Sequence, residues 1–167
     1  MITDLVQIKR LGEKQREENQ RFRAWLKRHN FVERRFKAIA EEVEESIDCT
    51  ACANCCRVAT TQISERDAER LSRHLGMKVS EFLRDYTVEL PDEGRILKRS
   101  PDGCVFLDGR VCSVYEMRPD TCRLFPHLIK GNGSLLSRMW HMPDRAVYCP
   151  IVFNALEQFK VETRFKQ

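Results

Sequence analysis

Glycine and proline are scarce in this chain of 167 residues, at 7 and 6 residues, which excludes collagen-like and linker-like sequences. No apolar run approaches the roughly 18 residues of a membrane span, and Met1–Arg10 lacks the apolar segment of a signal peptide. Charge of one sign is not in large excess either, because 29 Lys and Arg against 25 Asp and Glu leave only +4. We therefore expect a cytoplasmic protein with neither a membrane nor a nucleic acid partner.

The motifs of several enzyme classes are also missing. The sequence contains no glycine-rich phosphate loop, no G-x-S-x-G and no H-E-x-x-H. A glycine-rich loop for S-adenosylmethionine is absent as well, which argues against a methyltransferase that acts alone. Hydrophobic residues make up 42% and charged residues 32% of the chain, a composition typical of a folded domain of ordinary size.

Helical periodicity dominates the first 48 residues. Residues 13–48 contain neither proline nor glycine, and Phe36, Ile39, Val43 and Ile47 recur at intervals of three and four. A break near residues 29–30 would give two helices, and without it a single long helix results. We divide the chain into a charged helical N-terminal extension, residues 1–48, and a cysteine-cluster metal-binding domain, residues 49–167.

The helical extension carries a strongly basic segment. Residues 9–37 contain 11 Lys and Arg but only 4 Glu, a net charge of +7. Such a charge run is usually a solvated helix face. The alternative is a basic surface that binds an acidic protein partner through residues 9–37.

The remaining sequence predicts short elements. Ser64 and Asp67 have the spacing of a capping box at a helix start, and Ser80 is a second candidate N-cap. Asp108–Gly109 indicates a hairpin, and we favour a three-residue loop that places Cys104 opposite Cys112. A second hairpin would pair residues 128–129 with 135–136, and residues 151–165 would form a closing helix. The expected fold is α+β, with N-terminal helices, a cysteine-rich irregular core with small β-hairpins, and a C-terminal helix.

Cysteine is the one abundant unusual residue. Four of the eight cysteines fall within the run CTACANCCR at residues 49–57, in the spacing C-x2-C-x2-C followed by another cysteine. This spacing holds metal ions and iron–sulfur clusters, because a short turn can point successive thiolates at one centre. All eight are candidate metal ligands: Cys49, Cys52, Cys55, Cys56, Cys104, Cys112, Cys122 and Cys149.

Several readings of the cysteines remain open. A reducing compartment and a chain of this length argue against a disulfide scaffold, and thiol redox switching without metal is a further alternative. Zinc usually takes two separated C-x2-4-C knuckles, whereas C-x2-C-x2-C is more typical of a [4Fe–4S] cluster. The cofactor is therefore an iron–sulfur cluster or zinc, held at one site or two. Adjacent side chains diverge, so Cys55 and Cys56 are not expected to bind one ion together.

Two blocks of sequence resemble a known family. CTACANCCR and RVCSVYEMRPDTCRLFP, the latter covering Arg110–Pro126, are similar to the YkgJ-type cysteine-cluster family, a zinc- or iron-chelating CxxCxxCC domain. The resemblance covers residues 49–126 and extends towards Cys149. It implies metal or iron–sulfur binding. A similar cluster occurs in flagellin lysine methylases, where it serves methyl transfer.

Three arginines flank the cysteines. Arg57, Arg118 and Arg123 would lower thiol pKa values and raise a cluster's reduction potential. The alternative is that they pair with acidic side chains or cover apolar surface. The sequence leaves three roles open: a metalloprotein in redox, metal-handling or modification-support work, a group-transfer enzyme that uses the cluster, or an interaction module with a structural zinc.

Overall fold

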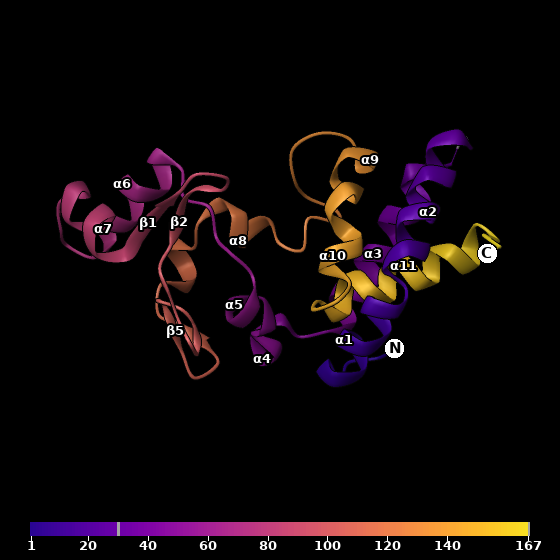
Figure 1. The fold of residues 1–167 in the computed structure, drawn as a ribbon, viewed down its shortest axis with the longest axis horizontal. Coiled ribbons are helices and arrows are strands. Elements are labelled where there is room, and N and C mark those ends of the chain that lie inside the picture. The colour runs from indigo at the N-terminus through magenta and orange to yellow at the C-terminus, as the bar shows by residue number, and fades with distance from the viewer. Residues whose placement is uncertain (30, 167) are drawn as a thin grey trace. The chain divides into compact units, whose positions relative to one another are not determined.

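The computed structural model describes residues 1–29 and 31–166 and has an α+β fold, as predicted (Figure 1). The chain forms two compact units. Unit one contains residues 1–48 and 126–167, and unit two contains residues 49–125. The sequence-based division instead grouped residues 126–167 with the cysteine domain. Within the described residues, no helix combines the length and apolar character needed to cross a membrane.

Unit one is helical, and its C-terminal helix packs against the N-terminal ones (Figure 1). The predicted closing helix is present as α11. The helices of unit one are α1 (Leu5–Lys14), α2 (Arg16–Arg28), α3 (Glu33–Ser46), α9 (Leu135–Arg138), the 3-10 helix η2 (Met139–His141), α10 (Met142–Arg145) and α11 (Pro150–Glu162).

The core of unit one gathers around Phe159 on α11. Its ring lies 5.7 Å from Phe22 and 5.0 Å from Phe36, in edge-on geometry that aromatic pairs prefer. On the same helix, the buried ammonium of Lys160 donates to Glu18 at 2.7 Å and pairs with Glu157. Residues from both ends of the chain thus share one core, because α11 covers the apolar faces of α2 and α3.

Two expectations for unit one have clear outcomes. Helix α2 ends at Arg28 and α3 begins at Glu33, so of the two alternatives the structure has the break and not the single long helix, although Asn30 itself lies outside the described residues. The predicted hairpin over residues 128–136 is wrong. Ser134 instead caps α9 by accepting from the backbone N–H of Ser137 at 3.3 Å, so residues 135–138 become a helical turn.

The basic segment of residues 9–37 is partly neutralised within unit one. Arg16 pairs with Asp144 at 2.5 Å, Arg35 with Glu162 at 3.3 Å and Lys37 with Glu41 at 3.6 Å. These pairs are exposed and contribute little stability. A protein partner for this segment stays a prediction.

Unit two consists of short elements. Its helices are α4 (Cys49–Cys52), α5 (Asn54–Val58), α6 (Glu65–His74), α7 (Val79–Tyr86), the 3-10 helix η1 (Tyr115–Met117) and α8 (Asp120–Leu124). Its strands form three antiparallel pairs: β1 (Thr87–Leu90) with β2 (Gly94–Leu97), β3 (Arg99–Ser100) with β4 (Gly103–Cys104), and β5 (Leu107–Asp108) with β6 (Val111–Cys112).

The two helix starts predicted in unit two, at Ser64 and Ser80, have different outcomes. The Ser64 hydroxyl accepts from the Asp67 N–H at 3.1 Å, and the Asp67 carboxylate accepts from the Ser64 N–H at 3.2 Å, which confirms the predicted capping box. Ser80 does not cap α7. The N-cap of that helix is Lys78, two residues earlier, and Glu81 accepts from the N–H of Lys78 at 2.9 Å.

The predicted hairpin register is wrong. Leu107 faces Cys112, and Cys104 pairs with Arg99 on β3. The turn is shorter than expected because Asp108 pairs with Val111, which leaves only Gly109 and Arg110 between the strands. Cys104 therefore belongs to a different hairpin from Cys112.

A small apolar core holds the elements of unit two together. Tyr86 stacks on Phe82 at 5.5 Å and on Phe106 at 5.2 Å. The fully or nearly buried members are Ile63, Ala68, Leu71, Phe82, Leu97, Phe106 and Val114. The two-stranded pairs are too small to be stable alone, so this core fixes their positions.

Among the glycines of unit two, Gly103 is expected to cost the most stability when it is replaced by alanine. Its φ is +134°, and a Cβ there would lie 2.7 Å from the Cys56 carbonyl oxygen and 3.1 Å from the Arg57 Cα. Gly103→Ala should lower the free energy of unfolding by about 3 kcal/mol, since both strain and a backbone clash arise. Urea denaturation followed by circular dichroism measures this.

Gly94→Ala is the matched control. Gly94 also has a positive φ of +70°, but nothing lies within 4 Å of a Cβ there. Its cost should be about 1 kcal/mol, the strain of the left-handed conformation alone. Equal losses for both variants would contradict the close approach of Gly103 to Cys56.

Candidate metal centre

The cysteine run folds as two short helices joined at Ala53. Ala53 has a left-handed backbone with φ of +48° and ends α4, because its N–H donates back to the Cys49 carbonyl at 3.0 Å. A non-glycine residue rarely adopts this conformation, and such strain is often found at functional sites. The turn starts α5, which places Cys55 and Cys56 on a different helix from Cys49 and Cys52.

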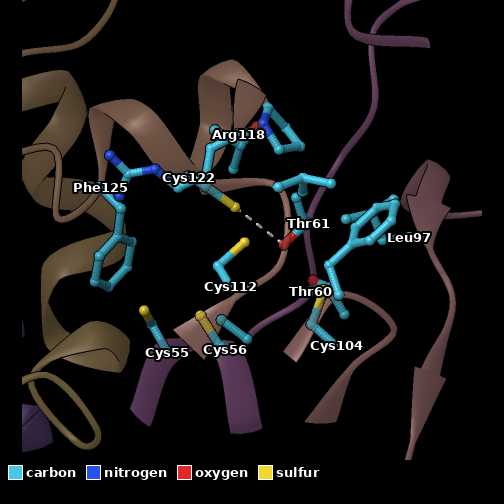
Figure 2. A pocket seen from close by; sticks show the side chains of 15 residues that line it. Cys55, Cys56, Thr60, Thr61, Leu97, Cys104, Cys112, Arg118, Cys122 and Phe125 are labelled. Atoms are coloured by element: carbon cyan, nitrogen blue, oxygen red, sulfur yellow. Dashed lines mark hydrogen bonds between the residues drawn. The ribbon is translucent and has the colours of Figure 1, made fainter. Parts of the chain in front are cut away.

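Five thiols from four elements line one pocket (Figure 2). Cys55 and Cys56 come from α5, Cys104 from β4, Cys112 from β6 and Cys122 from α8. Figure 2 shows the sulfur atoms of Cys55 and Cys56 pointing towards those of Cys112 and Cys122. The cavity has a volume of about 80 Å³.

Besides the thiols, Thr60, Thr61, Thr121 and Arg118, apolar residues form the pocket wall. They are Ala59, Leu97, Phe106, Val114, Pro119 and Phe125. Among them Leu97, Phe106 and Val114 belong to the buried core of unit two. A largely apolar wall lowers the local dielectric, which strengthens every charge interaction in the pocket.

Burial acts on three of the thiols in the same direction. It raises the pKa of Cys122 to about 11, and it also raises the pKa values of Cys104 and Cys112. The cause is that a thiolate loses hydration in an apolar site. In the absence of metal, these three side chains therefore stay neutral at pH 7.

Cys56 behaves in the opposite way. The pKa of its thiol falls to about 6, mainly because the Cys55 side chain hydrogen-bonds to it. Burial opposes this shift, while the positive charges of Arg118, Arg57 and Arg99 add to it. Cys56 is thus a thiolate at neutral pH.

Two arginines hold the backbone around the cysteine run. Arg57 donates to the carbonyl oxygens of Cys52 at 3.3 Å and Gly109 at 2.7 Å. Arg99 on β3 donates to the carbonyl oxygens of Arg57 and Ala59. Because each guanidinium bridges two separate carbonyls, the pair fixes the exit of α5 against the hairpins.

The three arginines that were expected to lower thiol pKa values do not all do so. Arg118 stacks over the Tyr115 ring at 3.6 Å and lowers the pKa of Cys56, as Arg57 does. Arg123 instead donates to Asp120 at 2.8 Å and lines a different pocket. Arg123 therefore follows the alternative reading, in which the arginine pairs with an acid.

Sequence reasoning missed Arg99 and Thr61. The Thr61 side chain, only 9% exposed, lies 3.5 Å from the Cys122 sulfur in hydrogen-bonding geometry, and the contact is drawn in Figure 2. Thr61 reaches this position because its carbonyl accepts from the Leu97 N–H at 2.9 Å. No spacing rule in the sequence links residues so far apart.

The other three predicted ligands lie elsewhere. Cys49 is exposed and Cys52 half-buried on α4, and neither lines the pocket. Cys149 is buried in unit one, at the N-cap of α11 and ahead of Pro150. Their roles as metal ligands stay predictions.

The pocket fits a thiophilic metal by its donor chemistry. Soft thiolates select zinc and iron–sulfur clusters, and neighbouring arginines offset their negative charge. As the side chains are placed, no three His, Cys, Asp or Glu within residues 1–29 and 31–166 are close enough to hold one ion. A metal ion at this pocket would therefore be held by thiols that lie closer together than they do here.

Comparison with known proteins supports the same chemistry. The family described as "Putative zinc- or iron-chelating domain", CxxCxxCC, matches residues 48–150. The chain belongs to this family. An uncharacterized protein of Methanocaldococcus jannaschii, MJ0661, is 30% identical over 90 residues, which cover 52% of this chain and 48% of that protein. The chain thus spans about half the length of this relative. No solved structure matches.

Selective alkylation should report the thiol environments. In the metal-free protein at pH 7, iodoacetamide is expected to modify Cys56 first, because its pKa of about 6 leaves it mostly ionised. Cys122, with a pKa of about 11, should react last of the five pocket thiols. Peptide mass spectrometry after short exposures from pH 5 to 9 measures both rates.

Cys55→Ala provides the control, since it removes the hydrogen bond that lowers the pKa of Cys56. The midpoint for Cys56 alkylation should then shift upward. Equal rates at Cys56 and Cys122 in the unmodified sequence would contradict the assigned environments.

Proposed function

We propose that unit two binds an iron–sulfur cluster through the pocket thiols, with zinc as the alternative metal, and that this centre serves a redox, metal-handling or modification-support role. The observation that carries the proposal is the convergence of five thiols from α5, β4, β6 and α8 on one pocket. Such convergence in a family of zinc- or iron-chelating domains supports a resident metal centre.

The number of thiols favours iron–sulfur over a single zinc ion. A structural zinc site uses four ligands in two separate knuckles, whereas this pocket has five thiols and α4 carries two more directly before it. The C-x2-C-x2-C spacing over Cys49, Cys52 and Cys55 is the spacing that wraps a cluster. Cluster binding would recruit Cys49 and Cys52 from α4, a helix of only four residues.

Neighbouring charge also supports a thiolate-ligated centre. Burial keeps Cys104, Cys112 and Cys122 protonated without metal, so binding must release their protons. Arg57, Arg99 and Arg118 are positive charges near the sulfur atoms, and they would stabilise the anionic centre and raise its reduction potential. Metal affinity should therefore fall steeply as the pH is lowered.

Purification without oxygen tests the proposal. The protein should contain stoichiometric iron and sulfide, absorb visible light, and give cluster signals in Mössbauer and EPR spectra. Stoichiometric zinc with no colour would select the alternative. Protein that holds neither metal would refute both.

Serine variants assign the ligands. Cys56→Ser and Cys122→Ser should each lower metal affinity by about tenfold or more, since even the loss of a residue that only hydrogen-bonds to a ligand costs that much. Ser113→Ala is the matched control, because Ser113 lies beside Cys112, donates to the Phe106 carbonyl at 3.2 Å and does not line the pocket. Its metal content should equal that of the original protein. Unchanged metal content in both cysteine variants would show that the pocket thiols do not hold the metal.

A further inference from the structure

A second pocket lies in unit two between α6 and α8, with a volume of about 320 Å³. Its lining is dominated by charge, with four arginines and three carboxylates. The arginines are Arg66, Arg70 and Arg73 on α6 and Arg123 on α8. Nothing in the thiol chemistry uses these side chains.

Two of the carboxylates are already neutralised inside the pocket. Asp67, 3% exposed, accepts from Arg70 at 2.7 Å and from the Asp120 N–H at 3.1 Å. Asp120 accepts from Arg123 at 2.8 Å and lies 3.6 Å from Arg70. These contacts build a rigid floor that joins the starts of α6 and α8.

The remaining arginines are not matched by acids. Within the described residues, no carboxylate lies within ion-pairing distance of Arg66 or Arg73, and Glu69 has no cationic partner. Four arginines against three carboxylates leave the pocket one positive charge in excess. An anion would therefore meet two guanidinium groups whose donors have no acidic partner.

The spacing of these groups suggests the size of the anion. Arg66, Arg70 and Arg73 follow at intervals of four and three, so they share one face of α6. Positions seven apart are separated by about 10 Å along a helix, so the two long side chains can each contact a different phosphate group of one anion. The volume is at the lower end for a pocket that binds a small molecule, about 300 Å³.

We propose that this pocket binds a small anion that carries two linked phosphate groups, held by Arg66 and Arg73 above the floor formed by Asp67, Arg70 and Asp120. The site is separate from the thiol pocket. Helix α8 contributes Asp120 and Arg123 to this pocket and Thr121 and Cys122 to the other. The proposal does not depend on the metal centre.

Calorimetric titration of the full chain with ADP tests the proposal. ADP should bind saturably at 150 mM salt, whereas adenosine, which lacks the phosphates, should not bind. Arg66→Gln combined with Arg73→Gln should weaken ADP binding about tenfold or more, since two charge-assisted contacts are lost. Glu69→Gln should tighten it, because it removes the uncompensated carboxylate.

The matched control combines Arg34→Gln with Arg110→Gln. Both side chains are exposed and lie outside the pocket, and the double change removes the same charge. ADP binding by this control should stay within about twofold of the original protein, because only screened long-range charge is lost. No saturable ADP binding by the original protein, equal binding by the two double variants, or binding of adenosine as tight as that of ADP would overturn the proposal.

Metal content separates this test from that of the metal centre. Iron and zinc are measured for each variant before and after titration, and all should match the original protein. A loss of ADP binding with unchanged metal supports the anion pocket alone, and metal binding without any ADP binding refutes it while leaving the metal centre intact.

Discussion

Burial of several thiols in one apolar pocket is the constraint on which the structure of unit two depends. A thiol is stable there when neutral, as the raised pKa values of Cys104, Cys112 and Cys122 show. A metal ligand must be a thiolate, which the same surroundings disfavour. The pocket therefore suits a cation that supplies charge at its centre, with arginines supplying the rest from outside.

The scaffold that brings the thiols together consists of single side chains rather than large sheets. Arg99 fixes the exit of α5 through two carbonyls, and Gly103 allows β4 to approach Cys56 without a side chain between them. Asp67 closes the capping box of α6 and also accepts from the first amide of α8, the helix that carries Cys122. Apart from the capping box, these contacts link elements far apart in sequence, and each is polar or needs the absence of a side chain.

The parts of this arrangement that were predictable depend on neighbouring residues. The capping box of Ser64 and Asp67 follows from a spacing of three, and the break before α3 follows from a change of pattern. The hairpin register was not predictable, since both the length and the position of the turn decide whether Cys112 faces Cys104 or Leu107, three residues further on. From the sequence we predicted that cysteines of the two motif blocks converge in space, at one site or two. The structure places five cysteines in one pocket. Thr61 and Arg99 could not be identified from the sequence, because contacts over 40 or 60 residues leave no periodic trace.

Helix α8 contributes side chains to both pockets of unit two, the thiol pocket and the arginine-lined pocket. It has only five residues, so its position depends on what its ends contact. Its first N–H donates to Asp67 Oδ1, which also accepts from Arg70, and Arg70 donates in addition to the Arg118 carbonyl at 2.8 Å. Arg118 in turn helps to lower the pKa of Cys56 and opposes the rise that burial causes in the pKa of Cys112. Direct contacts thus connect Arg70 on α6 to Arg118, and the positive charge of Arg118 acts on the thiols. The two pockets are therefore connected by direct contacts through α8 and Arg118, even though they share no lining residue.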